Sequence, residues 1–307
     1  MSKNHVNTSE NHVNTSESRL DTSDSLQRFL FEESDIRGQV VTLDNSIHQL
    51  LSIHHYPKPV EQLLSEALCA VVLMSSTLKF EGSLSLQIQG DGPLRLLHAQ
   101  ATHKQDIRGI ARFNDNTCFN DNISSAQGFK NLVAKGQMVI TIEPTSGKRY
   151  QGIVPIDGNS LAECLSHYFE QSEQLATRFE FHIAEQQSFG LMLQQMPTEK
   201  EGQANHFEHL GVLLNTLKDE EMASLPAQNI LTRLFHAEQL RLYPATPVAF
   251  SCSCSRERTL AALLSIGQNE IEQLLSEKPQ IEMTCEYCNT RYTFDKDDLG
   301  SGNDTVH

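Results

Sequence analysis

Four cysteines near the C-terminus have the residue type and spacing of a metal site. They form two pairs, one with a single intervening residue and one with two: Cys252, Cys254, Cys285 and Cys288. Zn²⁺ favours four soft or borderline ligands in a tetrahedron, and two short loops with two thiolates each supply that set. We therefore predict that these residues bind one Zn²⁺ per chain. Each pair also places two thiols close together, so that a cysteine attacked by an oxidant has a neighbouring cysteine as its partner. The spacing therefore indicates a redox switch as well.

Two simpler interpretations of the cysteines compete with this one. Most sites with four cysteine ligands only stabilise a small domain. A disulfide framework is the other, and it is disfavoured because the chain has 7 cysteines, an odd number, of which Cys69, Cys118 and Cys164 are scattered singly. Cys69 stands in an apolar run and is predicted to be a small core residue.

Composition argues against several classes of protein. Asp and Glu number 39 against 24 Lys and Arg, which gives a formal net charge of −15. This balance repels phosphate backbones and argues against a nucleic-acid partner. The longest apolar run, from Ala67 to Met74, is too short to span a membrane. The N-terminal residues are polar and lack the apolar segment of a secretory signal, so we expect a reducing compartment, the cytoplasm.

With 307 residues the chain is long enough for a full core and a smaller module. Residues 1–24 contain the heptapeptide Asn-His-Val-Asn-Thr-Ser-Glu twice, and one apolar residue per copy cannot form a coiled-coil seam, so we expect a disordered tail. Residues 25–196 are predicted to form the core domain and residues 197–249 a helical linker. Residues 250–307 are predicted to form the zinc-binding domain with the redox switch.

Hairpins dominate the pattern of the core. Alternating apolar residues and intervening turn residues predict strands at 83–89, 94–98, 138–142, 150–154, 179–183 and 191–193. A short helix is expected from Asn45, and a long buried helix follows Pro59, which a first helical turn tolerates. Ser160 and Glu163 form a capping box that opens a third helix. Because hairpins outnumber β-α-β units, the pattern predicts an α+β core with a largely antiparallel sheet.

Apolar stripes mark helices in the linker and in the C-terminal module. Phe207, Leu210, Leu214 and Leu217 share one helical face, and a second stripe spans residues 230–235. These stripes need a partner surface, either the core or another protein. Between the cysteine pairs we expect two short helices, the second capped by Asn269, rather than the β-rich loop of a nucleic-acid zinc ribbon. So little structure needs the metal in order to fold, and removing the metal should unfold the module.

No set of nucleophile, base and orienting residue is evident in the chain. The Gly90-Asp91-Gly92 segment is explained by a turn. His54 and His55 stand at a predicted helix end, where cationic side chains suit the helix dipole, and we expect no catalytic role for them. His206 and His209 could bind a metal from one helix face, but no third ligand is evident, so we interpret them as exposed polar positions. Disulfide chemistry by Cys285 and Cys288 usually asks for a thioredoxin-like β-α-β setting, which is missing. We predict that the protein is not an enzyme.

Several longer segments resemble the 33 kDa chaperonin family, the redox-regulated holdase chaperones of bacteria. The resemblance covers about residue 26 to the C-terminus, and the segments 252–258 and 285–288 look like the cysteine signature of the family. Other segments with this resemblance are 29–32, 77–80, 87–93, 149–152 and 168–175. Several motifs in the same order are far more specific than the cysteines alone.

The resemblance implies an ATP-independent chaperone that holds unfolded proteins. In the reduced state the four thiolates would hold Zn²⁺ and keep the module docked and inactive. Hypochlorous acid, or peroxide with heat, would then form the disulfides Cys252–Cys254 and Cys285–Cys288, release the zinc, unfold the module and free the linker. The oxidised chain is expected to form a homodimer and to bind unfolded client proteins.

Overall fold

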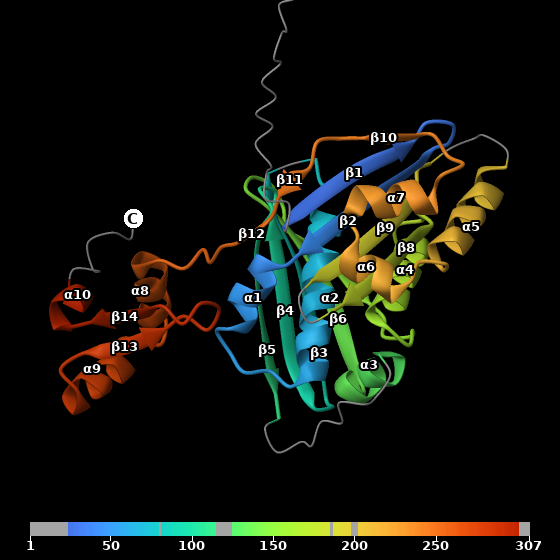
Figure 1. Ribbon diagram of the computed structural model, residues 1–307. Helices are drawn as coiled ribbons and strands as arrows, with labels where there is room; N and C mark the ends of the chain where they lie inside the picture. Colours follow the sequence, from blue (N-terminus) through green and yellow to red (C-terminus); the bar gives the residue numbers. More distant parts are fainter. Residues whose placement is uncertain (1–23, 80, 115–124, 185–186, 198–201, 301–307) are drawn as a thin grey trace, which may run out of the picture.

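The computed structural model describes residues 24–79, 81–114, 125–184, 187–197 and 202–300 (Figure 1). The duplicated heptapeptide and Cys118 lie outside these residues. The described chain folds into two six-stranded sheets, a small hairpin and helices around them, which confirms the predicted α+β class.

The first sheet, called sheet A, has the strand order β10-β1-β2-β9-β8, with β11 paired to β1. Its strands are β1 (Ser25–Phe31), β2 (Ile36–Leu43), β8 (Thr177–Ile183), β9 (Ser188–Gln195), β10 (Leu240–Leu242) and β11 (Thr246–Pro247). All of its pairings are antiparallel. The sequence pattern missed β1 and β2, because both faces of this sheet are covered and its central strands do not alternate cleanly between apolar and polar residues.

The second sheet, called sheet B, has the order β12-β5-β4-β3-β6-β7. Its strands are β3 (Gly82–Gly90), β4 (Leu94–Thr102), β5 (Asp106–Phe113), β6 (Gly136–Pro144), β7 (Tyr150–Val154) and β12 (Ala249–Phe250). Both predicted hairpins are present, although β4 runs four residues beyond the predicted end at His98, and β5 was not predicted. Only the short β12–β5 pairing is parallel.

Helix α2 (Lys58–Ser75) forms the centre of the core between the two sheets (Figure 1). Its sequence is apolar on nearly every side, as a fully enclosed helix requires, and the run from Ala67 to Ser75 is buried without interruption. Helices α1 (Asn45–Leu51), α3 (Ser125–Val133) and α4 (Leu161–Gln171) lie around it. Ser160 caps α4, since its hydroxyl accepts a hydrogen bond from the Glu163 amide at 3.2 Å. The Glu163 carboxylate instead accepts from Asn159, so only half of the predicted capping box is formed.

Helices α5 (Gln203–Leu214), α6 (Asp219–Ser224) and α7 (Ala227–Leu234) cover the other face of sheet A. The predicted stripe is buried there: Phe207, Leu210 and Leu214 pack with Phe29, Phe31 and Phe189 of the sheet. The partner surface of these helices is therefore the core itself in this state of the protein.

The C-terminal module follows directly on β12 and stands beside sheet B (Figure 1). It consists of α8 (Arg256–Leu264), α9 (Gln268–Glu277), the hairpin β13 (Ile281–Thr284) and β14 (Arg291–Phe294), and α10 (Lys296–Gly300). The two helices expected between the cysteine pairs are present as α8 and α9. The cap at Asn269 was wrong, because α9 begins one residue earlier, after a Gly267 with φ of 101°. The strand β13 at the end of this connection was not predicted. Its core is small: only Leu263, Ile271, Ile281 and Phe294 form its buried cluster.

Candidate metal centre

A strand and a helix cap hold the first cysteine pair in place. The amide of Ser251 donates to the Ile107 carbonyl at 3.0 Å, which continues the β12–β5 pairing up to Cys252. Ser255 then caps α8, since its hydroxyl accepts from the Arg258 amide at 3.2 Å. The Arg258 guanidinium also donates to the Ser253 carbonyl at 2.9 Å, which fixes the single residue between the two cysteines.

The second cysteine pair occupies the turn of the β13–β14 hairpin. The Cys285 amide donates to the Thr290 carbonyl at 2.9 Å, and the Asn289 amide donates to the Cys285 carbonyl at 2.8 Å. Asn289 has a φ of 55°, a left-handed conformation that asparagine tolerates better than most residues. This knuckle directs both sulfurs toward the first pair.

The fold brings all four predicted ligands together. Their sulfur atoms all lie within 4.8 Å of one another, with 3.7 Å between Cys252 and Cys285 and 3.4 Å between Cys254 and Cys288. Four thiolates at about 2.3 Å from a tetrahedral Zn²⁺ would be about 3.8 Å apart. The cluster therefore fits a tetrahedral ion of this size, and it is the one group of this kind in the described parts of the chain.

The electrostatics of the cluster suit a cation. Burial raises the pKa of Cys252 to about 12, with hydrogen bonds to neighbouring thiols as a further cause, and burial also raises the pKa of Cys285. Burial works in the same direction on Cys288, yet hydrogen bonds from the side chain and backbone of Thr290 lower its pKa to about 7. A bound divalent cation holds such thiols in the thiolate form.

The residues between the second pair of cysteines dock the module on the outer face of sheet B. The Tyr287 ring lies 4.5 Å beneath the Arg108 guanidinium, and its hydroxyl shares a 3.1 Å hydrogen bond with Nδ1 of His98. Burial, followed by the charge of Arg108, lowers the pKa of His98 to about 4, so the ring is neutral at pH 7. One residue of the metal knuckle thus contacts two strands of the core.

Three further contacts surround Tyr287. The Glu286 carboxylate pairs with Arg112, with 2.6 Å between Oε1 and Nη2, and its carbonyl lies 2.6 Å from Nε2 of His54. The Asn289 side chain donates to the Ile53 carbonyl at 3.0 Å. The metal knuckle and the docking surface are therefore the same five-residue turn, so a change in the knuckle alters the docking contacts directly.

Sequence reasoning missed these residues around the cluster. The partners of the knuckle in the core are about two hundred positions away along the chain, and no local pattern marks them. Tyr292, whose hydroxyl donates to the Cys254 sulfur at 3.2 Å, was also missed. Its position on the hairpin, four residues after Cys288, was the only available signal.

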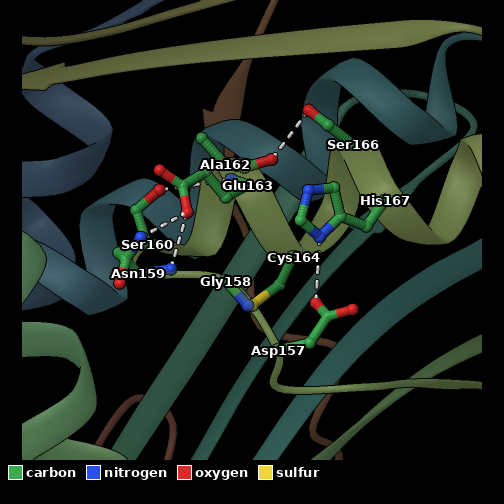
Figure 2. A network of polar contacts seen from close by, with 9 residues as sticks. All are labelled: Asp157, Gly158, Asn159, Ser160, Ala162, Glu163, Cys164, Ser166 and His167. Carbon is green, nitrogen blue, oxygen red and sulfur yellow. Dashed lines mark hydrogen bonds and ion pairs between the residues drawn. The ribbon is translucent and has the colours of Figure 1, made fainter.

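Outside the thiol cluster, Cys164 is the described cysteine whose surroundings most resemble those of an activated thiol (Figure 2). Its sulfur accepts a 3.3 Å hydrogen bond from the Gly158 amide, while His167 pairs with Asp157 at 3.1 Å. Cys164 is fully buried, and burial raises the pKa of its thiol. It is not an activated nucleophile. Cys69 is likewise buried in the core, as predicted.

The histidines had more specific environments than their sequence positions suggested. His206 was expected to be exposed, but it is largely buried, lies against the Phe31 ring and pairs with Glu238 at 3.2 Å. The reason is that α5 covers sheet A with the side that carries His206. His209 is exposed, as expected.

The fold and the thiol cluster together define a class: an α+β core with a helical cover and a docked four-cysteine module. The family profile described as Hsp33 protein matches residues 24–295. The 33 kDa chaperonin of Shewanella woodyi is 45% identical over 277 residues, which cover 90% of this chain and 94% of the relative. That of Aliivibrio fischeri is 42% identical over 294 residues, covering 92% and 99%.

A solved structure supports the fold. The crystal structure of the 33 kDa chaperonin (heat shock protein 33 homologue) of Thermotoga maritima superposes with a TM-score of 0.77 at 21% identity, covering 91% of this chain and 97% of that one. The chain thus belongs to the Hsp33 family, the 33 kDa chaperonins. None of the helices in the described ranges is long and apolar enough to cross a membrane.

Proposed function

We propose that the protein is a redox-regulated, ATP-independent holdase whose reduced, zinc-bound form is inactive. Family membership supports the role as a chaperone. The observation that carries the regulation is the placement of all four sulfurs within 4.8 Å of one another, on a turn that also docks the module on the core. Bound Zn²⁺ would keep the four thiolates deprotonated and stabilise a module whose own buried core is only four side chains.

Oxidation acts on the thiolates of Cys252, Cys254, Cys285 and Cys288. In the proposed pairing, Cys252 bonds to Cys254 and Cys285 to Cys288. Formation of each disulfide from two thiolates releases two electrons, which, with one proton from the solvent, reduce one hypochlorous acid to chloride and water. Neither short disulfide replaces the link between residues 254 and 285, so the module loses both its metal and the connection between its halves.

Unfolding of the module would directly affect the linker. The residues before Cys252 form β10, β11 and β12, which pair with both sheets, so an unfolded module removes support from this segment. The helices α5 to α7 are then held mainly by their packing on sheet A. The ion pair of α5 with the core, Arg178 with Glu208 at 2.7 Å, involves substantially exposed side chains and adds little.

Release of the helical cover would expose two apolar surfaces at once. One is the outer face of sheet A, with Phe29, Phe31 and Phe189, and the other is the stripe of α5. Unfolded clients bind such surfaces through the same hydrophobic effect. On this basis we propose the division into core (25–196), linker (197–249) and zinc-binding module (250–307). We further propose a cytoplasmic location and dimerisation after oxidation.

The test is a titration of the reduced protein with hypochlorite. Zinc release is followed with a colorimetric chelator, and light scattering of a heat-denatured client reports protection without ATP. We expect about one zinc per chain to leave as protection appears. A Cys252→Ser variant should bind zinc weakly and lose the normal switching, whereas Cys164→Ala should switch normally. If zinc leaves and no client is protected, the site only stabilises the module; turnover in an insulin-reduction assay would favour a thiol oxidoreductase.

A further inference from the structure

A cavity at the edge of the core, partly open to solvent, has no part in the chemistry of the thiol cluster. It lies near the C-terminal end of α2, between the two sheets and α4, and has a volume of about 350 Å³. Small-molecule sites typically measure about 300–1,000 Å³. Much of its wall is apolar: Met74, Leu78, Leu84, Ile140, Ile142 and Phe169. By size and lining it could hold the apolar body of a small ligand.

Arg37 is the one cation among the residues that line this cavity. Both its Nε and its Nη2 donate to Oε1 of Gln194, the former at 3.0 Å. Gln194 is 1% exposed, and its amide donates to the Thr177 hydroxyl at 2.9 Å, which in turn donates to the Leu175 carbonyl at 2.9 Å. This relay fixes the direction of the guanidinium across three strands without neutralising its charge.

No carboxylate in the described part of the chain forms an ion pair with Arg37, and burial lowers the pKa of its guanidinium. The one carboxylate in the cavity wall, Glu173, accepts hydrogen bonds from the hydroxyls of Tyr168 at 3.0 Å and Tyr150 at 3.4 Å. A partly buried cation without a counter-charge is costly. An oxyanion on the remaining N–H groups of the guanidinium would offset that cost, and the planar guanidinium suits a carboxylate in particular.

We propose that this cavity binds a small amphipathic carboxylate, with its carboxylate on Arg37 and its apolar chain against Met74, Ile140 and Phe169. The ligand would stabilise the core between the two sheets. This site is separate from the thiol cluster, so it does not depend on the redox switch proposed above.

The test uses decanoate, below its micellar concentration, with the reduced, zinc-loaded full chain. Isothermal titration calorimetry measures affinity and stoichiometry, and NMR of methyl-labelled methionine reports the Met74 methyl group. We expect saturable binding at one site with a shift of the Met74 signal. Arg37→Gln should weaken binding at least about 10-fold, because a charge-assisted hydrogen bond is lost. The matched control Arg95→Gln, at an exposed arginine of β4, should leave it unchanged.

Leu78→Trp provides a second variant that fills the cavity while keeping Arg37. It should block decanoate binding, and thermal unfolding checks that each variant is folded. Decyltrimethylammonium and decanol serve as charge controls and should bind at least about 10-fold more weakly than decanoate. The proposal is overturned if decanoate does not bind the wild-type chain, if it binds Arg37→Gln or Leu78→Trp as tightly as the wild type, or if the ammonium compound binds equally well.

Discussion

The docking of Tyr287 on sheet B offers the sharpest test of how the metal knuckle communicates with the core. Arg108→Gln, combined with His98→Leu, removes both core partners of this side chain and leaves every residue of the module intact. Intrinsic zinc binding by the four cysteines is therefore unchanged, whereas the docking equilibrium is weakened. The hydrogen bond of Arg108 to Gln100 is lost in the docked and undocked states alike, so it cancels.

The expected size of the effect follows from two contacts. The cation–π contact at 4.5 Å contributes about 0.5–2 kcal/mol, and the hydrogen bond to His98 about 0.5–1.5 kcal/mol. Together they amount to about 1–3.5 kcal/mol, which corresponds to roughly a 5- to 300-fold shift toward the undocked module. Arg108→Gln alone should shift it by roughly 2- to 30-fold.

Fluorine NMR of the chain labelled with 3-fluorotyrosine measures this shift, because the protein has only 6 tyrosines and Tyr287→Phe assigns the relevant signal. The double variant should move that signal toward the undocked position and release zinc faster under hypochlorite. Arg95→Gln, at an exposed arginine of the neighbouring strand β4, is the matched control. If the double variant keeps the docked Tyr287 signal and the zinc-release rate of Arg95→Gln, the knuckle does not hold the module on the core and the reasoning is wrong.

Three other predictions concern the metal, the thiols and the core. Cys285→Ser should abolish stoichiometric zinc binding and unfold the module, seen as fast hydrogen exchange throughout residues 250–295, while α2 keeps its protection; a protected module would contradict metal-dependent folding. Zinc affinity should rise with pH between about 6 and 8, because zinc must displace protons from Cys252, with its pKa of about 12, and from Cys285, whose pKa is also raised. Chelator competition measures the slope of affinity against pH, and a flat profile would show that no protons are displaced. Burial raises the pKa of Glu66 in α2 to about 7, above its unfolded value, so the free energy of unfolding should fall as pH rises from about 4.5 to 7 and then level off. Glu66→Gln should therefore recover about 2–3 kcal/mol at pH 8 in urea unfolding. An equal effect of the substitution at pH 5 and at pH 8 would refute the assignment.

Local patterns in the sequence were enough for the elements whose formation depends on neighbouring residues. Pro59 and the apolar run behind it predicted the enclosed helix α2, and the turn residues around Asp91 predicted the β3–β4 hairpin. The strands β1 and β2 were missed because they are covered on both faces, by α2 and by the linker helices. A strand of that kind loses the alternation that reveals a half-buried strand.

The linker shows where pattern reasoning stops. The stripe of Phe207, Leu210 and Leu214 correctly predicted a helix that needs a partner, but not which surface that partner is. The outer face of sheet A became the partner only once β1, β2 and β9 were brought together from distant parts of the chain. The same holds for His206, whose pairing with Glu238 depends on where α5 lies.

The sequence by itself determined which four cysteines form the cluster, because ligand type and short spacing are local properties of two loops. It also determined the family, through ordered motifs and 42–45% identity to its relatives. Only the tertiary structure decided that the knuckle is also the docking surface, with Tyr287 between Arg108 and His98. It also decided that Arg37 faces a cavity and forms no ion pair with a carboxylate of the described residues. Those contacts join residues far apart in the chain, and their positions depend on how two sheets pack around one helix, which no local pattern encodes.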